Sequence, residues 1–177
     1  MADTMNFAPE FDAPIDYMRR TREYYLKLGY DNPYRWAHYT DAPFAPLKKP
    51  LKDSTVALIT TAAPYQAALG DQGPRAPYNA AAKFYTVYSE ATDAMVDLRI
   101  SHVGYDRVHT TAEDPNTWLP LVQLQQTVKA GRIGALTPRL HGAPTNRSQR
   151  VTMETDAPEL LRRCREDGAD AVLLVPS

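Results

Sequence analysis

The C-terminal part of the sequence most constrains the fold, because a helical pattern leads directly into an apolar strand pattern. In residues 156–168 the apolar residues recur at helical spacing, and Leu160, Leu161 and Cys164 are predicted to face inward. Residues 171–175, AVLLV, form the kind of uninterrupted apolar run found in strands buried on both faces. A helix followed by such a strand predicts an α/β fold.

The ends of this helix carry recognisable signals. Asp156 and Glu159 have the spacing of a capping box around Pro158, which is favoured in the first turn of a helix. Gly168 is the expected stop, because glycine readily adopts the left-handed conformation that ends helices. We therefore expect a helix that begins after Asp156 and ends before Gly168.

Similar patterns predict the other elements of the chain. Helices are expected at residues 14–28 and 120–131, and strands at residues 54–61 and 97–104. Residues 80–92 could form a helix, from their alanine-rich start, or a strand, from the stretch FYTVY, and we favour the helix. The segment that carries Arg139 and His141 is expected to be a loop. Strands separated by helices predict a mostly parallel sheet with flanking helices. Three expected strands are few for such a sheet, so we expect a second polypeptide segment to complete it.

The sequence also suggests two regions. Four prolines crowd the segment before the first expected strand: Pro33, Pro43, Pro46 and Pro50. Each proline removes a backbone donor and disfavours helix at the residue before it, so this segment is expected to be an extended wrap. We predict that residues 1–53 form a tail, a helix and this wrap. Residues 54–177 are predicted to form an α/β domain that is incomplete at its C-terminal end.

Composition excludes several classes of protein. The net charge of −1 does not indicate binding to nucleic acid or to a membrane surface. The single cysteine, Cys164, excludes an internal disulfide framework and a zinc site built from several thiolates. Its helical spacing predicts a buried side chain rather than a nucleophile. The acidic start has no apolar signal core, which favours a cytoplasmic protein. We predict no metal site and no cofactor in this chain.

Ligands of open α/β sheets bind beyond the carboxyl ends of the strands, where we expect three segments to meet: residues 60–78, residues 104–118 and whatever follows Ser177. One of them contains a histidine beside hydroxyl and carboxylate groups, which suits acid–base catalysis or substrate orientation. Its candidate residues are Asp106, His109, Thr110, Thr111 and Glu113. The alternative is a polar loop whose side chains satisfy their own backbone, which is the commoner role of such residues.

A second candidate group could bind a carboxylate or phosphate: Arg139, His141 and Asn146. A solvated loop is again the commoner alternative, because arginine is mostly exposed.

Two separated stretches resemble component B of the glycine, sarcosine, betaine and D-proline reductases. They are PNTWLPLVQLQQTVKAGRIGAL at residues 115–136 and DGADAVLLVPS at residues 167–177. The stretches HTTAED and HGAPTNRS are similar to those of the cysteine-containing branch of that family. The resemblance implies a selenol- or thiol-dependent reductase that cleaves a carbon–nitrogen bond in an amine-bearing acid.

The resemblance also implies where the chemistry occurs. The family's redox cysteine or selenocysteine would come directly after Ser177, on a longer chain, a processed precursor or a companion polypeptide. Thr60, Thr61, Pro176 and Ser177 would then form the platform of the site. The implied partners are the polypeptide carrying the redox residue, a dithiol reductant and a subunit with a pyruvoyl group, to which the substrate amine is held as an imine or otherwise activated.

Two other functions stay open from the sequence. One is a non-catalytic small-molecule-binding or scaffold subunit, which predicts a stable solitary domain. The other is a cofactor-free racemase or lyase that uses His109 and Glu113 as acid and base. The reductase hypothesis differs from the first in expecting an exposed apolar edge at residues 172–175.

Overall fold

The computed structural model describes residues 16–30, 38–74, 76–100, 102, 105, 112–144 and 148–176. The chain divides into two compact units, Met1–Thr40 and Asp41–Ser177. The predicted division at residue 53 stays a prediction. Within the described part of the chain, every helix is too short or too polar to span a lipid bilayer.

The first unit contains helix α1, Tyr17–Lys27. Asp16 caps it by accepting a hydrogen bond from the backbone N–H of Arg19 at 3.1 Å. Gly29, with φ of +84°, follows the last turn as predicted. Of the predicted apolar face only Tyr25 is buried, while Met18 and Leu28 are exposed within the described residues.

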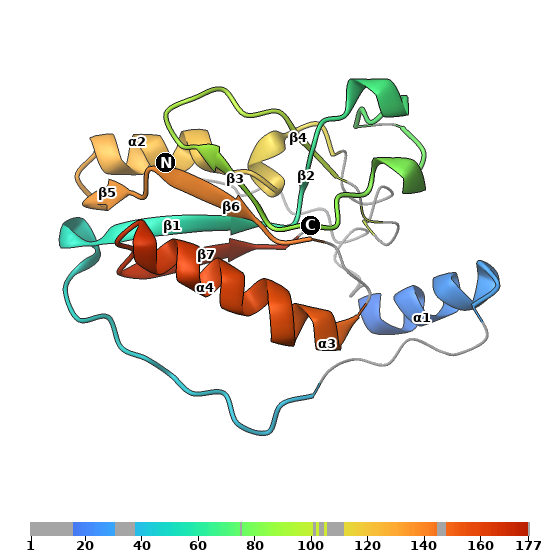
Figure 1. Cartoon of the computed structure of the whole chain (residues 1–177), viewed down its shortest axis with the longest axis horizontal. Coiled ribbons are helices and arrows are strands. Elements are labelled where there is room, and N and C mark those ends of the chain that lie inside the picture. The colour runs from blue at the N-terminus through green and yellow to red at the C-terminus, as the bar shows by residue number, and fades with distance from the viewer. Residues whose placement is uncertain are drawn as a thin grey trace, which may run out of the picture. The chain divides into compact units, whose positions relative to one another are not determined.

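The second unit is built on a five-stranded sheet with β1, Thr55–Thr60, at its centre (Figure 1). On one side β1 pairs in parallel with β7, Ala171–Val175. On its other side it pairs in parallel with β5, Ala135–Leu136, and with β6, Arg139–Gly142. Strand β3, Tyr88–Ala91, pairs antiparallel with β6. The predicted α/β fold is confirmed, but its sheet is mixed and only partly parallel.

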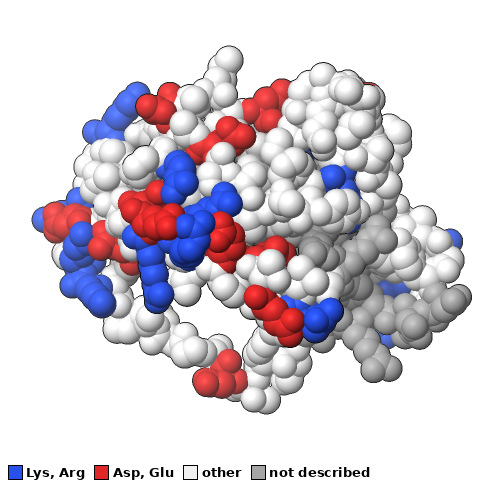
Figure 2. Space-filling model, in the orientation of Figure 1, with Lys and Arg blue, Asp and Glu red and all other residues white. Residues whose placement is uncertain are grey.

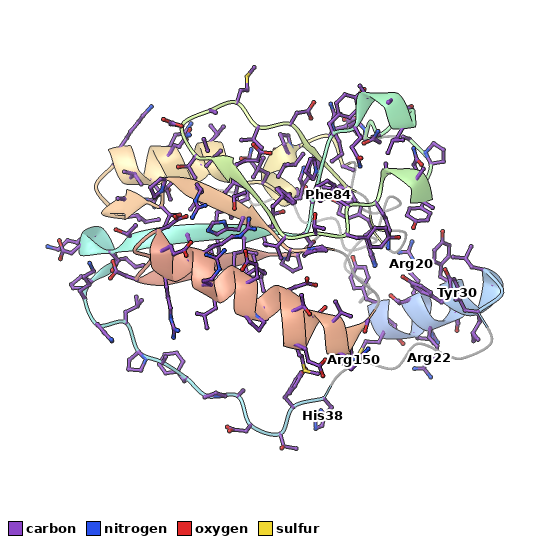
Figure 3. The ribbon with its side chains drawn as sticks, viewed as in Figure 1. Arg20, Arg22, Tyr30, His38, Phe84 and Arg150 are labelled. Atoms are coloured by element: carbon purple, nitrogen blue, oxygen red, sulfur yellow. The ribbon has the colours of Figure 1, made fainter. Side chains whose placement is uncertain are left out.

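The helix predicted at residues 80–92 is wrong. The alanine-rich start forms only a 3-10 turn, Ala80–Ala82, and the rest leads into strand β3. Tyr88 is buried in the core and its hydroxyl donates to the carbonyl of Ala62 at 2.6 Å. Phe84, labelled in Figure 3, packs edge-on against the Tyr88 ring with the centroids 5.5 Å apart. These tertiary contacts and the β preference of aromatic residues outweigh the helical preference of the alanines.

The loop predicted around Arg139 and His141 is also wrong, because it contains β5 and β6. Both strands pair with the same side of β1, and Thr137 and Pro138 lie between them. The break at Pro138 divides the apolar pattern into pieces too short to be recognised as a strand.

A separate two-stranded ribbon lies beyond the end of β1. Strand β2, Ala63–Pro64, pairs antiparallel with β4, Leu98–Arg99. The strand predicted at 97–104 is therefore confirmed for two residues, while residues 101, 103 and 104 lie outside the described part of the chain.

Helices pack on both faces of the sheet (Figure 1). On one face α2, Leu121–Lys129, contributes Leu121 and Leu124 to a core with Leu58 and Leu140. On the other face α4, Ala157–Glu166, packs Cys164 against Ala57 and Ile59. Further short helical turns lie at Leu51–Asp53, Ala67–Leu69 and Pro115–Thr117. The helix predicted at 120–131 is confirmed.

The helix that ends in α4 begins earlier than predicted, so the capping box at Asp156 is wrong. Its first turn, α3, is Gln149–Val151, and Ser148 caps it by accepting from the N–H of Val151 at 3.2 Å. A π-helical turn, Thr152–Asp156, joins α3 to α4. Pro158 has no N–H to donate to the preceding turn, and the wider π turn accommodates that lost bond.

Two side chains differ from their predicted roles in this helix. Asp156 makes no side-chain cap bond; it is buried, and burial raises the pKa of its carboxyl group. Leu161, predicted to face inward, is 50% exposed. Cys164 is buried as predicted. Figure 2 shows acidic and basic side chains interspersed over α4, where Glu159 pairs with Arg162 and Arg163.

Strand β7 forms as predicted but lies at an edge of the sheet. β1 is its partner on one side, and no described strand pairs with its other side. Val172, Leu173 and Leu174 are 48%, 38% and 60% exposed. Because neighbouring residues of a strand point to opposite faces, both faces of β7 carry uncovered apolar side chains. The prediction of a fully buried strand is therefore wrong for these three residues.

A polar cluster joins the C-terminal end of α4 to β6 and β3. Arg139 donates to the Asp167 carboxylate from Nε at 3.1 Å and from Nη2 at 2.7 Å. His141, fully buried, places Nε2 3.2 Å from Oδ2 of Asp167, without the alignment of a full hydrogen bond. Its Nδ1 lies 2.9 Å from Oγ of Ser89, which also accepts from Arg163 at 2.8 Å. Because the Asp167 carboxylate can only accept, the proton of the neutral imidazole is assigned to Nε2, and Ser89 then donates to Nδ1.

Gly142 allows β6 to pass closely under the Tyr88 ring. A Cβ at residue 142 would lie 1.8–2.4 Å from three ring carbons of Tyr88. We expect Gly142→Ala to lower the free energy of unfolding by about 3 kcal/mol, because the ring is held by packing and by its hydroxyl. Gly131→Ala is the comparison: no atom lies within 4 Å of a new Cβ there, and its only cost is the positive φ of +68°, which Gly142 does not have. Equal losses in urea titrations of the two variants would contradict this explanation.

His141 should make stability depend on pH. Burial lowers the pKa of its imidazole below the value of the unfolded chain, although Asp167 opposes the shift. The unfolded chain therefore binds a proton that the folded chain does not, and the free energy of unfolding should fall as the pH drops below about 6.5. In urea titrations across this range, His141→Gln should show a shallower pH dependence than the unmodified protein. Parallel pH profiles would be the opposite result.

Candidate functional site

The carboxyl end of β1 is organised around the hydroxyl group of Thr60. This side chain is fully buried, and its Oγ1 donates to the carbonyl of Trp118 at 2.5 Å while accepting from the N–H of Ala62 at 3.1 Å. Thr61, the next residue, donates its N–H to the carbonyl of Val175 at 3.3 Å. Thr60 thus positions Trp118, and Thr61 joins the ends of β1 and β7.

Trp118 connects this strand end to the β2–β4 ribbon. Its ring is buried, and indole Nε1 donates to the carbonyl of Leu98 at 3.3 Å. The turn that presents it, Pro115–Thr117, begins at Asp114, whose carboxylate accepts from the N–H of Asn116 at 2.9 Å. Trp118 therefore bonds to the end of β1 through its carbonyl and to the β2–β4 ribbon through its indole.

A small pocket lies beside Trp118, over β4. Its lining consists of Gln72, Gly73, Pro74, Arg99, Ile100, Ala112 and Trp118. An adjoining pocket shares Gln72, Gly73, Arg99 and Ile100 and extends toward Asn79. The pocket is therefore built at the end of the sheet where α/β proteins bind ligands.

Side-chain amides fix the loop that walls this pocket. Gln72 accepts from the N–H of Gln66 at 3.1 Å and donates to the carbonyls of Gln66 and Gly70 at 2.8 and 3.0 Å. Asn79 donates to the carbonyl of Leu69 at 2.5 Å. These bonds satisfy backbone groups that no strand pairs, so the wall is preformed.

Arg99 is the charged side chain of the pocket. It donates to the Asp97 carboxylate from Nε at 2.6 Å and from Nη2 at 2.9 Å, and its guanidinium lies 4.8 Å from the centre of the Tyr65 ring. Hydrogen bonding to Asp97 raises the pKa of Arg99 further, so the group is cationic at every working pH. An arginine held in this way can bind a carboxylate with two hydrogen bonds.

The structure describes only some of the predicted site residues, and these do not all lie together. Asp106, His109, Thr110, Thr111, Asn146 and Ser177 lie outside the described residues. Glu113 is exposed beside Ala112, which lines the pocket with a φ of +55°. Arg139 and His141 belong to the polar cluster under α4 and are not among the lining residues of the pocket. Their predicted contact with substrate stays a prediction.

The sequence did not single out Arg99, Gln72 and Trp118 as site residues. Trp118 lies within the stretch that resembles the reductase family, which was the available signal. The sequence placed Arg99 only within a strand. Arg99 and Asp97 are two residues apart, so they lie on the same face of an extended chain, where charged residues commonly face solvent. Across the described residues, no group of three or more His, Cys, Asp or Glu side chains is placed to hold a metal ion.

Cys164 lies on the α4 face of the sheet, among Ala57 and Ile59. It is 4% exposed, and burial raises the pKa of its thiol. A thiol nucleophile needs a lowered pKa and access to its substrate, so Cys164 has the opposite of both properties.

Comparison with known proteins connects this fold to a family. The family model for glycine/sarcosine/betaine reductase selenoprotein B matches residues 29–177. D-proline reductase subunit gamma of Acetoanaerobium sticklandii is 33% identical over 132 residues, which cover 74% of this chain and 52% of that protein. The chain thus spans about half the length of this curated relative. No solved structure matches the chain.

The matched region includes the whole sheet, the pocket residues and both stretches that suggested the resemblance. The chain therefore belongs to the glycine/sarcosine/betaine reductase selenoprotein B family.

Proposed function

We propose that this chain is part of a selenol- or thiol-dependent reductase subunit that reductively cleaves a carbon–nitrogen bond in an amine-bearing acid. The observation that carries the proposal is the family match, which runs from residue 29 through β7 to residue 177. Strand β7 lies beside β1 with Val175 opposite Thr60, so a redox residue that follows β7 would enter at the carboxyl edge of the sheet.

The proposed reaction consumes two thiols, or a thiol and a selenol. The thiolate or selenolate forms a bond to the α-carbon while the carbon–nitrogen bond breaks, and the amine leaves with the bonding electron pair and a proton. A second thiol attacks the sulfur or selenium, and the released carbon takes up a proton. The carbon is reduced by two electrons, a disulfide or selenide–sulfide forms, and a dithiol reductant restores it by exchange.

The redox residue would come from outside residues 1–177, because Cys164 is buried on the other side of the sheet from the pocket. We propose that the polypeptide segment supplying it packs along β7. The supporting observation is the exposure of Val172, Leu173 and Leu174 on an edge strand, where a further strand can pair and apolar residues can cover both faces.

The remaining parts of the proposal concern location and partners. We place the protein in the cytoplasm, where a dithiol reductant is kept reduced. A partner subunit with a pyruvoyl group would activate the substrate amine. The HTTAED loop, with His109, Thr110, Thr111 and Glu113, would form a wall of the site, and Asp106, Arg139, His141 and Asn146 stay candidates for substrate contact.

The function is tested on the native protein purified with its companion polypeptide. Glycine, sarcosine, betaine and D-proline are supplied with dithiothreitol, and released amine (for D-proline, the ring-opened product) and oxidised dithiol are measured. We expect one of these acids to be cleaved with one dithiol oxidised per bond broken, and alkylation of the thiols to stop the reaction. Cleavage that survives alkylation, or no cleavage of any of the four, would overturn the proposal.

The edge of β7 provides a test of assembly. Leu174→Lys should weaken binding of the companion polypeptide by about tenfold or more, because a buried unpaired charge is costly. Val122→Lys on α2 is the matched control, since Val122 is 56% exposed and lies on another element. Affinities from titration calorimetry should separate the two variants. Equal affinities would show that the companion does not cover β7.

Cys164 should behave as a structural thiol. We expect it to react with a disulfide reagent at least about tenfold more slowly in the folded protein than in urea, because the thiolate is disfavoured and enclosed. Cys164→Ala should leave the rate of reductive cleavage by the assembled enzyme unchanged. Loss of cleavage in a variant whose thermal unfolding is unaltered would instead give Cys164 a redox role.

A further inference from the structure

The guanidinium of Arg99 donates hydrogen bonds to Asp97 from one edge, which leaves the donors of its end available to a ligand. Asp97 accepts from Nε and Nη2, which occupies the side of the fork nearest the main chain. Arginine has five N–H donors, so one on Nη2 and two on Nη1 remain. Among the described residues, no hydrogen-bond acceptor is paired with these three donors. The N–H groups of Nη1 and Nη2 at the end of the guanidinium point in the same direction and form an open fork, which fits the two oxygens of a carboxylate.

The open fork is held in place by its surroundings. Arg99 pairs with Ala63 in the β2–β4 ribbon, and the N–H of Tyr65 donates to the carbonyl of Asp97 at 3.0 Å. The Tyr65 ring lies under the guanidinium at 4.8 Å. A side chain that is already fixed loses little conformational entropy when it binds a ligand.

Charges around the pocket select the kind of ligand. Asp97 already neutralises Arg99, so a multiply charged anion such as phosphate would meet little net positive potential. Asp71 is a second carboxylate whose field reaches Arg99, and its Oδ1 fixes the N–H of Gly73 at 2.9 Å. Gly73 itself lines the pocket. A small molecule with both a carboxylate and a cationic amine fits this arrangement better than a simple anion.

The pocket is small and partly open to solvent, so it would enclose only the part of a ligand that meets Arg99. Trp118 and Ile100 supply apolar walls beside Arg99, and Trp118 links the pocket to Thr60 at the end of β1.

We propose that the pocket at Arg99 is the substrate-binding site for the carboxylate of a zwitterionic amine-bearing acid, which the open fork of Arg99 binds through two hydrogen bonds. This assignment rests on the proposed reductase function and adds the residue that recognises the acid. Asp97 and Tyr65 are positioning residues, because they act on the ligand through Arg99.

Binding without turnover tests the proposal. The protein with its companion polypeptide is titrated with D-proline and glycine in the absence of dithiol, followed by calorimetry. Pyrrolidine and methylamine serve as probes that lack the carboxylate. We expect the acids to bind and the amines to bind at least about tenfold more weakly, because a charged hydrogen-bond pair is lost.

Variants of Arg99 supply the second measurement. Arg99→Gln should weaken binding of the acids by about tenfold to a hundredfold, and Arg99→Lys should retain part of the affinity because it keeps the charge but loses the fork. Arg150→Gln is the matched control: Arg150 is an exposed arginine, labelled in Figure 3, that pairs with Glu154. Thermal unfolding of each variant shows whether its fold is retained.

The outcomes separate this proposal from the proposed function. Acid binding that depends on Arg99, in a complex that cleaves no carbon–nitrogen bond, would support the binding site and overturn the reductase. Cleavage with a KM unaffected by Arg99→Gln would overturn the binding site alone. Unchanged affinity in Arg99→Gln, equal binding of acids and amines, or no binding of either acid to the unmodified complex would also overturn it.

Discussion

The structure of the second unit depends on the burial of β1. Its residues Val56–Ile59 are almost fully enclosed, because strands lie on both sides and helices on both faces. A backbone without access to water must satisfy its donors and acceptors within the sheet. Parallel pairing with β7 and with β5 and β6 does this, and it brings the carboxyl ends of the strands to one edge. The hydroxyl of Thr60 then donates to the carbonyl of Trp118, which fixes the position of that residue beyond the strand end.

Sequence patterns predicted the parts of the fold that depend on local signals. The apolar runs of β1 and β7 are continuous, and the helices near residues 121–129 and 157–166 have clear apolar spacing and glycine stops. The failures at β3 and at β5 and β6 have a common cause. Each of these strands is short and takes its stability from partners distant in the sequence, as when Tyr88 packs against Gly142. The propensities of neighbouring residues do not predict partners that are distant in the sequence.

The candidate site was less predictable than the fold. The sequence indicated the edge of the sheet at which the pocket lies, because that inference needs only the direction of parallel strands. It did not indicate Arg99, since an arginine two residues after an aspartate resembles any exposed strand face. The pocket exists because β4 pairs with β2 and Trp118 bonds to Leu98, and neither contact has a signal in spacing or composition. Arg139 and His141, which the sequence did single out, have Asp167 as their partner.

In the proposed reaction, the pocket at Arg99 would bind the acid and the segment after β7 would supply the redox residue. Val175 is in register with Thr60, and paired strands lie about 4.8 Å apart, so a residue that followed β7 would emerge one strand spacing from the end of β1. Trp118 joins that strand end to the pocket that contains Arg99. A thiolate or selenolate arriving along β7 would therefore approach the strand end that Trp118 joins to the pocket. The cysteine of this chain cannot take that position, because α4 holds it against the opposite face of the sheet from the pocket.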